Sequence, residues 1–368
     1  MNDWYRIKNI EDLDTPALVV YPDRVKQNIA LAITMAGSVD RLRPHVKTHK
    51  SKEVTQLLLN AGVTKFKCAT IAEAEMLGMV QAPDVLLAYQ PVGPKIKRFI
   101  ELIMTYPQTD FSCLVDSEAI VVELDQAANA AGISIPVYID VNVGMNRTGI
   151  LPEKATALYA RIAPLQHLTI RGLHAYDGHI HDASFEVRKK QSDTAFAAVE
   201  AVKKKLMDLG MTEPVLIIGG SPTFPIHAKR KKVECSPGTF VYWDYGYSAT
   251  CREQHFLPAA LVVSRVISLP DPTTVCTDLG HKSIAAENTL GNRVYFINAP
   301  DIVVEGQSEE HLKLNAGEGH PFRIGDVFYG MPVHVCPTVA LYEKVLLVEN
   351  GIVGKEWKTI ARDRKITL

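Results

Sequence analysis

The sequence predicts an α/β protein in which an N-terminal (β/α)8 TIM-like barrel precedes a mainly β domain. Two observations predict the barrel. Short apolar runs of strand length alternate with longer amphipathic runs, and the strand-like runs number eight, which is the number that closes such a barrel. A third observation marks the second domain, because beyond Cys251 the helical runs stop and the strand-like runs are separated by Gly and Pro turns.

The expected barrel elements follow a lead-in strand at 17–21 and a helix at 23–35. Eight segments have the length and apolar character of buried strands: 41–47, 65–69, 84–89, 111–115, 136–142, 168–176, 215–219 and 233–242. Amphipathic runs of helical length lie between most of them: 51–61, 72–79, 95–105, 118–131, 153–162 and 187–209. No long helical pattern follows Tyr242, so the eighth helix of the barrel has the weakest support.

The C-terminal part is expected to be rich in strands. The strand-like runs there are 261–269, 274–277, 293–297, 327–335 and 344–348, and no strong helical pattern interrupts them. We therefore place the barrel domain at 14–250. The β domain is placed at 251–368, joined by residues 1–13.

The composition is that of an ordinary soluble globular protein, and the chain is long enough for one large domain and a smaller one. The 368 residues are 47% hydrophobic and 22% charged, and the net charge is −1, which offers no electrostatic basis for binding nucleic acid or a membrane surface. No apolar run approaches the ~20 residues of a spanning helix. The N-terminus lacks the pattern of a signal peptide, and six cysteines occur without CxxC spacing, so we expect a reducing, cytoplasmic location.

The residue at the end of the first expected strand is Lys47. In a barrel of this kind, the chemistry lies at the carboxyl ends of the strands. A lysine at the mouth of a buried strand is costly unless its ammonium group finds a partner or its pKa falls. The same placement suits a lysine that attacks an aldehyde to form a Schiff base, and the alternative is a solvated surface lysine.

A phosphate site is expected where the last two strands end. Gly219 and Gly220 can point backbone amides into one concavity, and the hydroxyls of Ser221 and Thr223 can add donors. A second such turn, with Gly238 and Thr239, follows the next strand, and barrels often bind phosphate with these two loops. A plain turn is the alternative. A phosphate site together with a reactive lysine describes pyridoxal 5′-phosphate.

Several motifs, in a fixed order along nearly the whole chain, resemble those of one family. They are Asp14-Thr15-Pro16, Arg43 to Lys50, Gly144-Met145-Asn146-Arg147-Thr148-Gly149, Gly219 to Thr223, Pro237-Gly238-Thr239 and His334-Val335-Cys336-Pro337-Thr338. The chain resembles the alanine-racemase-like, fold type III pyridoxal-phosphate enzymes. Within them it is similar to the D-threonine aldolase and D-serine dehydratase group. This resemblance implies a barrel with a β domain, a homodimer and a D-amino acid substrate.

The resemblance also implies roles for individual residues. Lys47 would carry the cofactor, whereas Lys50 is a competing choice that lies past the strand end and should point outward. Arg147 would lie near the phenolic oxygen of the cofactor or the carboxylate of the substrate, and Tyr176 would lie against the cofactor ring. A surface ion pair for Arg147 and a core position for Tyr176 are the alternatives.

A metal site is expected at His334 and Cys336. On a strand, residues i and i+2 point to the same face, so the imidazole and the thiolate could converge on one ion. These ligands favour Zn²⁺, and two protein ligands leave open positions on the ion. The resembled bacterial aldolases carry an aspartate at the second position and use metals like Mn²⁺, so Mn²⁺ stays possible. The His-x-Cys form is typical of D-serine dehydratases.

Two reactions therefore compete. We expect a lyase that cleaves D-3-hydroxy amino acids to glycine and an aldehyde, as D-threonine aldolases do, with His179 or His181 as the general base for the hydroxyl. The alternative is a zinc-dependent D-serine dehydratase that forms pyruvate and ammonia. An amino-acid racemase and a non-catalytic pyridoxal-phosphate-binding protein are further alternatives, and neither needs the metal pair.

Overall fold

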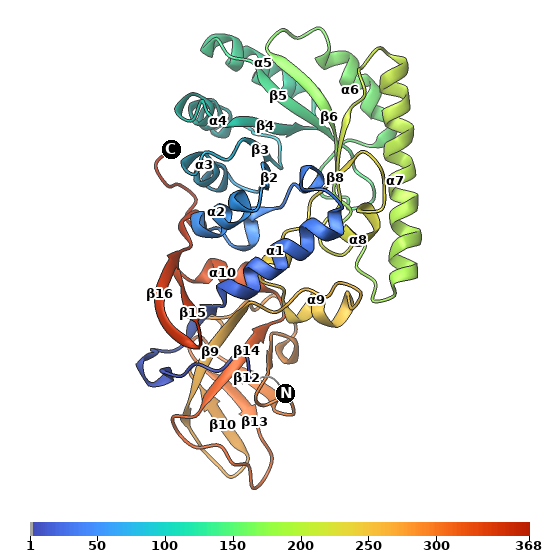
Figure 1. Ribbon diagram of the computed structural model, residues 1–368. Coiled ribbons are helices and arrows are strands. Elements are labelled where there is room, and N and C mark those ends of the chain that lie inside the picture. Colours follow the sequence, from blue (N-terminus) through green and yellow to red (C-terminus); the bar gives the residue numbers. More distant parts are fainter. Residues whose placement is uncertain (1–2) are drawn as a thin grey trace. The chain divides into compact units, whose positions relative to one another are not determined.

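The computed structural model describes residues 3–368, and the chain divides into two compact units (Figure 1). The barrel unit comprises Ala30–Lys47, Lys52–Gly238 and Asp363–Leu368, and the remaining residues up to Arg362 form the sheet unit. The chain passes between the units inside helix α1 (Pro22–Ala36). The expected domain limits stay a prediction, and residues 1 and 2 of the expected β domain lie outside the described residues. None of the helices within residues 3–368 is long and apolar enough to cross a membrane.

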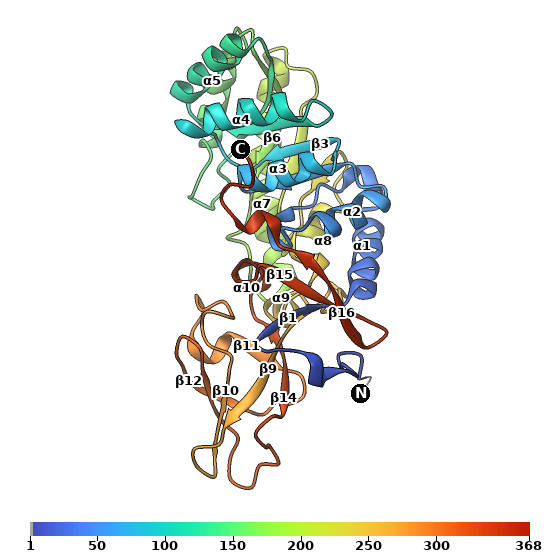
Figure 2. The ribbon, with the colours of Figure 1, turned by 90° about the vertical axis from the view of Figure 1, so that its left-hand side faces the viewer.

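The barrel unit is built on seven parallel strands that pair in sequence order. They are β2 (Lys65–Cys68), β3 (Asp84–Leu87), β4 (Asp110–Val115), β5 (Ile135–Asp140), β6 (Leu168–Ala175), β7 (Val215–Ile218) and β8 (Val233–Cys235). The helices between them are α2 (Lys52–Asn60), α3 (Ile71–Met79), α4 (Pro94–Thr105), α5 (Glu118–Ala131), α6 (Ala155–Ile162), α7 (Phe185–Asp208) and α8 (Phe224–His227). Figures 1 and 2 show these helices outside the strands, and Leu86, Leu114, Tyr138 and Ile217 pack together as one buried cluster.

The expected strand at 41–47 was wrong as a strand, although the segment takes the eighth place in the ring. Short 3-10 turns at Val39–Arg41 and Val46–Thr48 flank it. Leu42 forms an isolated parallel bridge to Cys235 of β8, and His45 forms one to Lys67 of β2. Pro44 supplies no amide hydrogen, which shortens the ladder, but its carbonyl still accepts the amide of Lys67 at 2.9 Å.

Arg43 holds this closing segment from the inside. Its side chain is 1% exposed, its Nε donates to Glu234 of β8 at 2.7 Å, and its two terminal nitrogens each donate to Asp84 of β3 at 2.7 Å. A fork of this kind fixes both distance and orientation. Arg43 therefore joins the closing segment to strands on both sides of the ring.

The sheet unit contains a nine-stranded, mostly antiparallel sheet. Its strands are β1 (Ala17–Val20), β9 (Ala260–Ser268), β10 (Thr274–Thr277), β11 (Val294–Phe296), β12 (Val303–Gln307), β13 (Leu312–Asn315), β14 (Val327–Pro332), β15 (Lys344–Glu349) and β16 (Ile352–Lys358). The lead-in strand β1 pairs with β9 and with β15 and so belongs to this sheet. The core of the unit gathers Val19, Leu261, Val263, Tyr329 and Met331 with further apolar side chains.

The five strands expected after Cys251 are all present, and three more, β12, β13 and β16, were not predicted. Strand β12 carries an exposed Val303 and a glycine, and β16 has three consecutive exposed residues, so neither shows the apolar pattern of a buried strand.

The expected strand 327–335 was too long. It ends at Pro332, and helix α10 (Val335–Leu341) follows with His334 as its N-cap residue. The carboxylate of Asp244 accepts the amide hydrogen of Val335 at 3.1 Å, which satisfies a free donor at the start of that helix. Pro337 also fits a first helical turn, where its missing amide hydrogen is not needed.

Replacing Arg43 by Met should destabilise the protein by about 3–5 kcal/mol, because Asp84 loses its bidentate partner and Glu234 keeps only Lys65. Arg171→Met is the matched control, since Arg171 pairs with Asp110 at the surface and its loss should cost about 1 kcal/mol or less. Denaturant unfolding followed by circular dichroism measures both changes. Equal small losses would show that Arg43 does not hold the ring closed.

Candidate active site

A cavity of about 290 Å³ lies at the carboxyl ends of the barrel strands. Its lining is unusually polar for a barrel interior and comprises His45, Lys47, Lys67, Ala69, Ala88, Tyr89, Asp140, Arg147, Thr148, His174 and Tyr176. Most of these residues lie in or just after a parallel strand, so the strand ends bring them to one rim. Polar side chains from five separate segments converge there.

Lys47 lies in the 3-10 turn that ends the closing segment, and its side chain is partly buried. Its Nζ lies 5.8 Å from the centroid of the Tyr176 ring, and Cζ of Arg147 lies 5.2 Å from the same centroid. The structure thus brings together Lys47, Arg147 and Tyr176, three of the residues that the sequence assigned to the cofactor. Lys50 has a left-handed φ of 51° and belongs to the sheet unit.

Lys67 is a third cation in this cavity, and the sequence analysis missed it. Its side chain is 2% exposed, and its Nζ lies 5.7 Å from the Tyr176 centroid. Burial, followed by repulsion from Lys47, lowers the pKa of Lys67 to about 7. The sequence did contain a signal for Lys67. It lies next to Phe66 inside an expected buried strand, where a lysine is costly unless it has a partner or a function.

A buried histidine–carboxylate pair forms another part of the wall. Nδ1 of His174 lies 2.7 Å from Oδ1 of Asp140, and both side chains are almost fully buried. Burial lowers the pKa of His174, although Asp140 opposes the shift, so the ring is neutral near pH 7. Among the described residues Nε2 of His174 has no hydrogen-bond partner. With Nδ1–H donated to Asp140, Nε2 is a free acceptor in the cavity wall.

The glycine turn after β7 is tightly built. Gly219 has a φ of +81°, and a Cβ added there would come within 2.6 Å of Cδ2 of His227. A Cβ added at Gly220 would come within 2.9 Å of Cε2 of Tyr176, so only glycine leaves room beside that ring. Oγ of the buried Ser221 accepts the amide hydrogen of Gly238 at 3.3 Å. The turns after β7 and β8 therefore meet, while Thr239 belongs to the sheet unit.

Thr223 holds this turn in shape. Its hydroxyl donates to Asp177 at 2.8 Å and accepts the amide hydrogen of Gly220 at 3.4 Å. The other carboxylate oxygen of Asp177 lies 2.8 Å from Nε2 of His227. Because its hydroxyl hydrogen is already committed, Thr223 acts on the conformation of the turn and has no hydrogen left for a phosphate.

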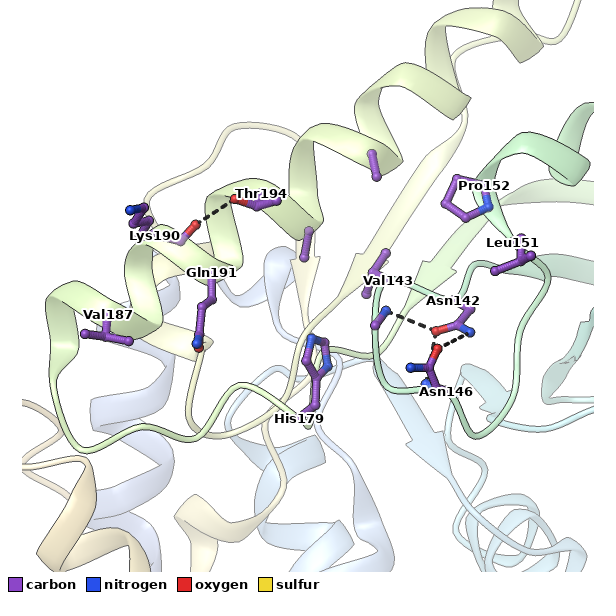
Figure 3. A pocket seen from close by; sticks show the side chains of 13 residues that line it. Asn142, Val143, Asn146, Leu151, Pro152, His179, Val187, Lys190, Gln191 and Thr194 are labelled. Atoms are coloured by element: carbon purple, nitrogen blue, oxygen red, sulfur yellow. Dashed lines mark hydrogen bonds between the residues drawn. The ribbon is translucent and has the colours of Figure 1, made fainter.

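His179 and His181 lie away from the Lys47 cavity and are both exposed. His179 lines a separate cavity of about 850 Å³ between helix α7 and the loop after β5 (Figure 3). Figure 3 shows its ring beside that loop, where Asn142 accepts the amide hydrogens of Gly144 and Asn146. A Cβ added at Gly144 would lie 2.7 Å from Nε2 of His179, so ring and loop are in close contact.

His334 and Cys336 converge at the start of α10, although not as neighbours on a strand. Burial lowers the pKa of His334, but Cys336 and Glu287 outweigh it and raise the value to about 9. Nδ1 of His334 lies 2.6 Å from Glu287, and Sγ of Cys336 lies 3.1 Å from the hydroxyl of Thr48, the residue that follows Lys47 in the chain. Within residues 3–368, no three His, Cys, Asp or Glu side chains are grouped closely enough to hold a metal.

These residues fit the two groups that the sequence predicts. The tight glycine turn leaves room that a side chain would fill, and three cations surround one aromatic ring beside it. This arrangement suits an anionic, aromatic aldehyde phosphate such as pyridoxal 5′-phosphate. The imidazole and thiol at the start of α10 are side chains of the kinds that bind Zn²⁺, and they would supply two ligands.

Known proteins match the chain over most of its length. The alanine racemase N-terminal domain family matches residues 20–246, and a putative serine dehydratase domain matches residues 259–348. The D-threonine aldolase of Arthrobacter sp is 26% identical over 358 residues, covering 95% of this chain and 93% of that protein. The D-threo-3-hydroxyaspartate dehydratase of Delftia sp. strain HT23 is 27% identical over 360 residues, covering 90% and 93%.

A solved structure shows the same fold. The crystal structure of D-threonine aldolase from Filomicrobium marinum matches with a TM-score of 0.88 and 26% identity, covering 95% of this chain and 96% of that one. The chain therefore belongs to the alanine-racemase-like family of pyridoxal-phosphate enzymes. Within that family its full-length relatives are named aldolases and dehydratases, which confirms the group that the sequence resembles.

Replacing Gly220 by Val should weaken binding of pyridoxal 5′-phosphate by about tenfold or more, because the added side chain collides with the Tyr176 ring. Fluorescence titration of the apoprotein measures the affinity, and thermal unfolding measures stability. Gly354→Val is the control, since an added Cβ there meets no atom within 4 Å. If stability falls as much as affinity, the turn is structural and does not bind the cofactor.

Proposed function

We propose that the protein is a pyridoxal-phosphate and metal-dependent lyase that cleaves D-3-hydroxy amino acids to glycine and an aldehyde, like a D-threonine aldolase. The observation that carries this proposal is the cavity in which Lys47 and Arg147 flank the Tyr176 ring beside the glycine turn. The similarity to D-threonine aldolases from two sources, each 26% identical, supports the aldolase over other reactions of the family.

The barrel residues have separate tasks in this proposal. The cofactor, when bound, supplies an electron sink for the bond that breaks at Cα of the substrate. Lys47 would hold the cofactor through its aldehyde carbon, and Tyr176 would pack against the ring. We place Gly219, Gly220, Ser221 and Gly238 at the phosphate. The amide hydrogens of the three glycines are bonded to Ala175, Thr223 and Ser221, so those bonds would have to be exchanged for bonds to the phosphate, and Thr223 fixes the conformation of the turn. We also place Thr239 at the phosphate.

Arg147 and the histidines at the end of β6 complete the barrel site. Arg147 binds an anionic oxygen, either the cofactor phenolate or the substrate carboxylate. The substrate hydroxyl needs a general base, for which His179 and His181 are both exposed and accessible. His174 is the candidate that the geometry favours, because its unpartnered Nε2 lies in the wall of the Lys47 cavity itself.

We further propose that His334 and Cys336 hold a divalent metal ion that polarises the substrate hydroxyl. Thiolate and imidazole favour Zn²⁺, and Mn²⁺ is a second possibility. Glu287 bonds Nδ1 of His334 and thereby orients the ring with Nε2 free for the ion.

The second candidate function is that of a zinc-dependent D-serine dehydratase. Cys336 favours it, because the His-x-Cys pair is the form typical of dehydratases, and a full-length relative is a D-threo-3-hydroxyaspartate dehydratase. The same lysine, ring and metal pair would serve both reactions. The two differ in whether the bond to Cβ or the bond to hydrogen breaks at Cα.

The wider organisation follows from the same proposal. We place the cofactor site in a barrel domain at 14–250. We place the metal pair in a β domain at 251–368 that includes 1–13. The two family matches support this division, because the first ends at residue 246 and the second begins at residue 259. We propose a homodimer acting on small D-amino acids. Within residues 3–368 none of the six cysteines forms a disulfide, which suits a reducing cytoplasm.

The decisive experiment incubates the holoenzyme with D-threonine and with D-serine and measures all products. The proposal predicts glycine and acetaldehyde from D-threonine in excess over pyruvate and ammonia from D-serine. If pyruvate and ammonia are the main products, the protein is a dehydratase and not an aldolase. L-threonine is the control substrate and should not be cleaved.

The same assay with a chelator tests the metal. Turnover should be lost while the absorption of the bound cofactor stays unchanged, and added Zn²⁺ or Mn²⁺ should restore it. Full activity after chelation, verified by metal analysis, would show that the reaction does not need a metal.

A further inference from the structure

Lys67 is a buried cation that the proposed function does not use. It lies on the inward face of β2, where its partner in the isolated bridge is His45 of the closing segment. Its side chain is 2% exposed, and among the described residues no carboxylate lies within ion-pair distance of its Nζ. Leaving an ammonium group in such a place is costly, and a fold retains it where a ligand compensates.

The nearby carboxylates are already engaged. Asp140 bonds Nδ1 of His174, and Asp177 bonds both Thr223 and His227. They attract Lys67 only over a longer distance. Neither carboxylate therefore forms an ion pair with the ammonium group of Lys67.

The side chains that line the cavity carry more positive than negative charge. Lys47, Lys67 and Arg147 all lie between 5.2 and 5.8 Å from the Tyr176 centroid, and Asp140 is the one carboxylate among the residues that line the cavity. Covalent attachment of an aldehyde would occupy Lys47, and a single anionic oxygen could satisfy Arg147. A second basic group remains beside the same ring.

We propose that Lys67 binds an anionic oxygen in the loaded site and is a second positioning lysine beside the one that takes the cofactor. This inference rests on the proposed function. The oxygen can come from the cofactor phenolate or from the substrate carboxylate. On the pyridoxal ring, the phenolic oxygen is attached to the carbon next to the one that bears the aldehyde, so a cation that shares the cavity with Lys47 is suited to it.

The role has a measurable consequence before any substrate is added. The absorption of the Lys47-bound cofactor changes with pH when the nitrogen that joins the two loses its proton. A neighbouring ammonium group disfavours a positive charge on that nitrogen. Removing the charge of Lys67 should therefore raise the pH midpoint of this change.

The test compares the wild-type holoenzyme with Lys67→Met and Lys67→Arg, using Lys65→Met as control. Lys65 is on the same strand and face, but it is paired with Glu234 and does not line the cavity. Lys67→Met should raise the pH midpoint by about one unit or more. It should also weaken binding of pyridoxal 5′-phosphate by about tenfold to a hundredfold, as the loss of a hydrogen bond to a charged group does. Lys67→Arg should keep most of the affinity, and Lys65→Met should match the wild type.

The substrate arm distinguishes the two sources of the oxygen. If the carboxylate is the partner, Lys67→Met still raises the midpoint, because the charge is lost in either case, but it leaves the cofactor affinity unchanged and weakens binding of D-threonine and not of its amide, which lacks the carboxylate. If Lys67→Met does not fold, Lys67→Gln removes the charge, keeps a donor and should show the same direction of change.

An unchanged midpoint, cofactor affinity and D-threonine affinity in the variant overturn the proposal while leaving the proposed function intact. A wild-type protein that forms no covalent adduct with pyridoxal 5′-phosphate overturns both.

Discussion

The site depends on how the ring of parallel strands is closed. The segment that follows α1 is too short and too interrupted by Pro44 to be a regular strand, yet it bonds to β8 on one side and to β2 on the other. Arg43 secures it through buried ion pairs to both flanks of the ring. Lys47 comes at its end, so the position of the reactive amine is set by a few backbone hydrogen bonds and one guanidinium group. The interactions that close the barrel therefore also fix the position of its reactive lysine.

The second feature of the site is an excess of positive charge around one aromatic ring. Two lysines and an arginine share a cavity in which the carboxylate is already bonded to His174. Such an arrangement is unfavourable in the free protein and becomes favourable when an anionic ligand enters. A side chain added to the glycine turn after β7 would collide with Tyr176 or His227. The space beside the turn therefore limits the shape of the ligand that can bind there. The charge and the space together explain why a phosphorylated aromatic aldehyde fits.

Much of this could be predicted from sequence because periodicity and strand-end polarity are local signals. The alternation of strand-like and helical runs predicted the barrel. The positions of strand ends and the family resemblance together predicted roles for Lys47, Arg147 and Tyr176. Other features depend on the three-dimensional neighbourhood. Lys67 resembles a solvated residue unless its strand is known to face the barrel interior, and the hydroxyl of Thr223 is committed to Asp177, which lies 46 residues away. His334 and Cys336 were assigned to a strand. The helix that starts at Val335 instead depends on a hydrogen bond to the carboxylate of Asp244, which lies 91 residues away in the sequence.

The most direct test of the central claim is to locate the covalent bond between protein and cofactor. The holoenzyme would be treated with borohydride to fix the cofactor, digested with a protease, and the modified lysine identified by tandem mass spectrometry. We expect a single modified residue, Lys47, and loss of the modification in Lys47→Ala but not in Lys50→Ala. Modification of Lys67 or Lys50 instead would contradict it, because the reactive amine would then not be the one that the closing segment positions.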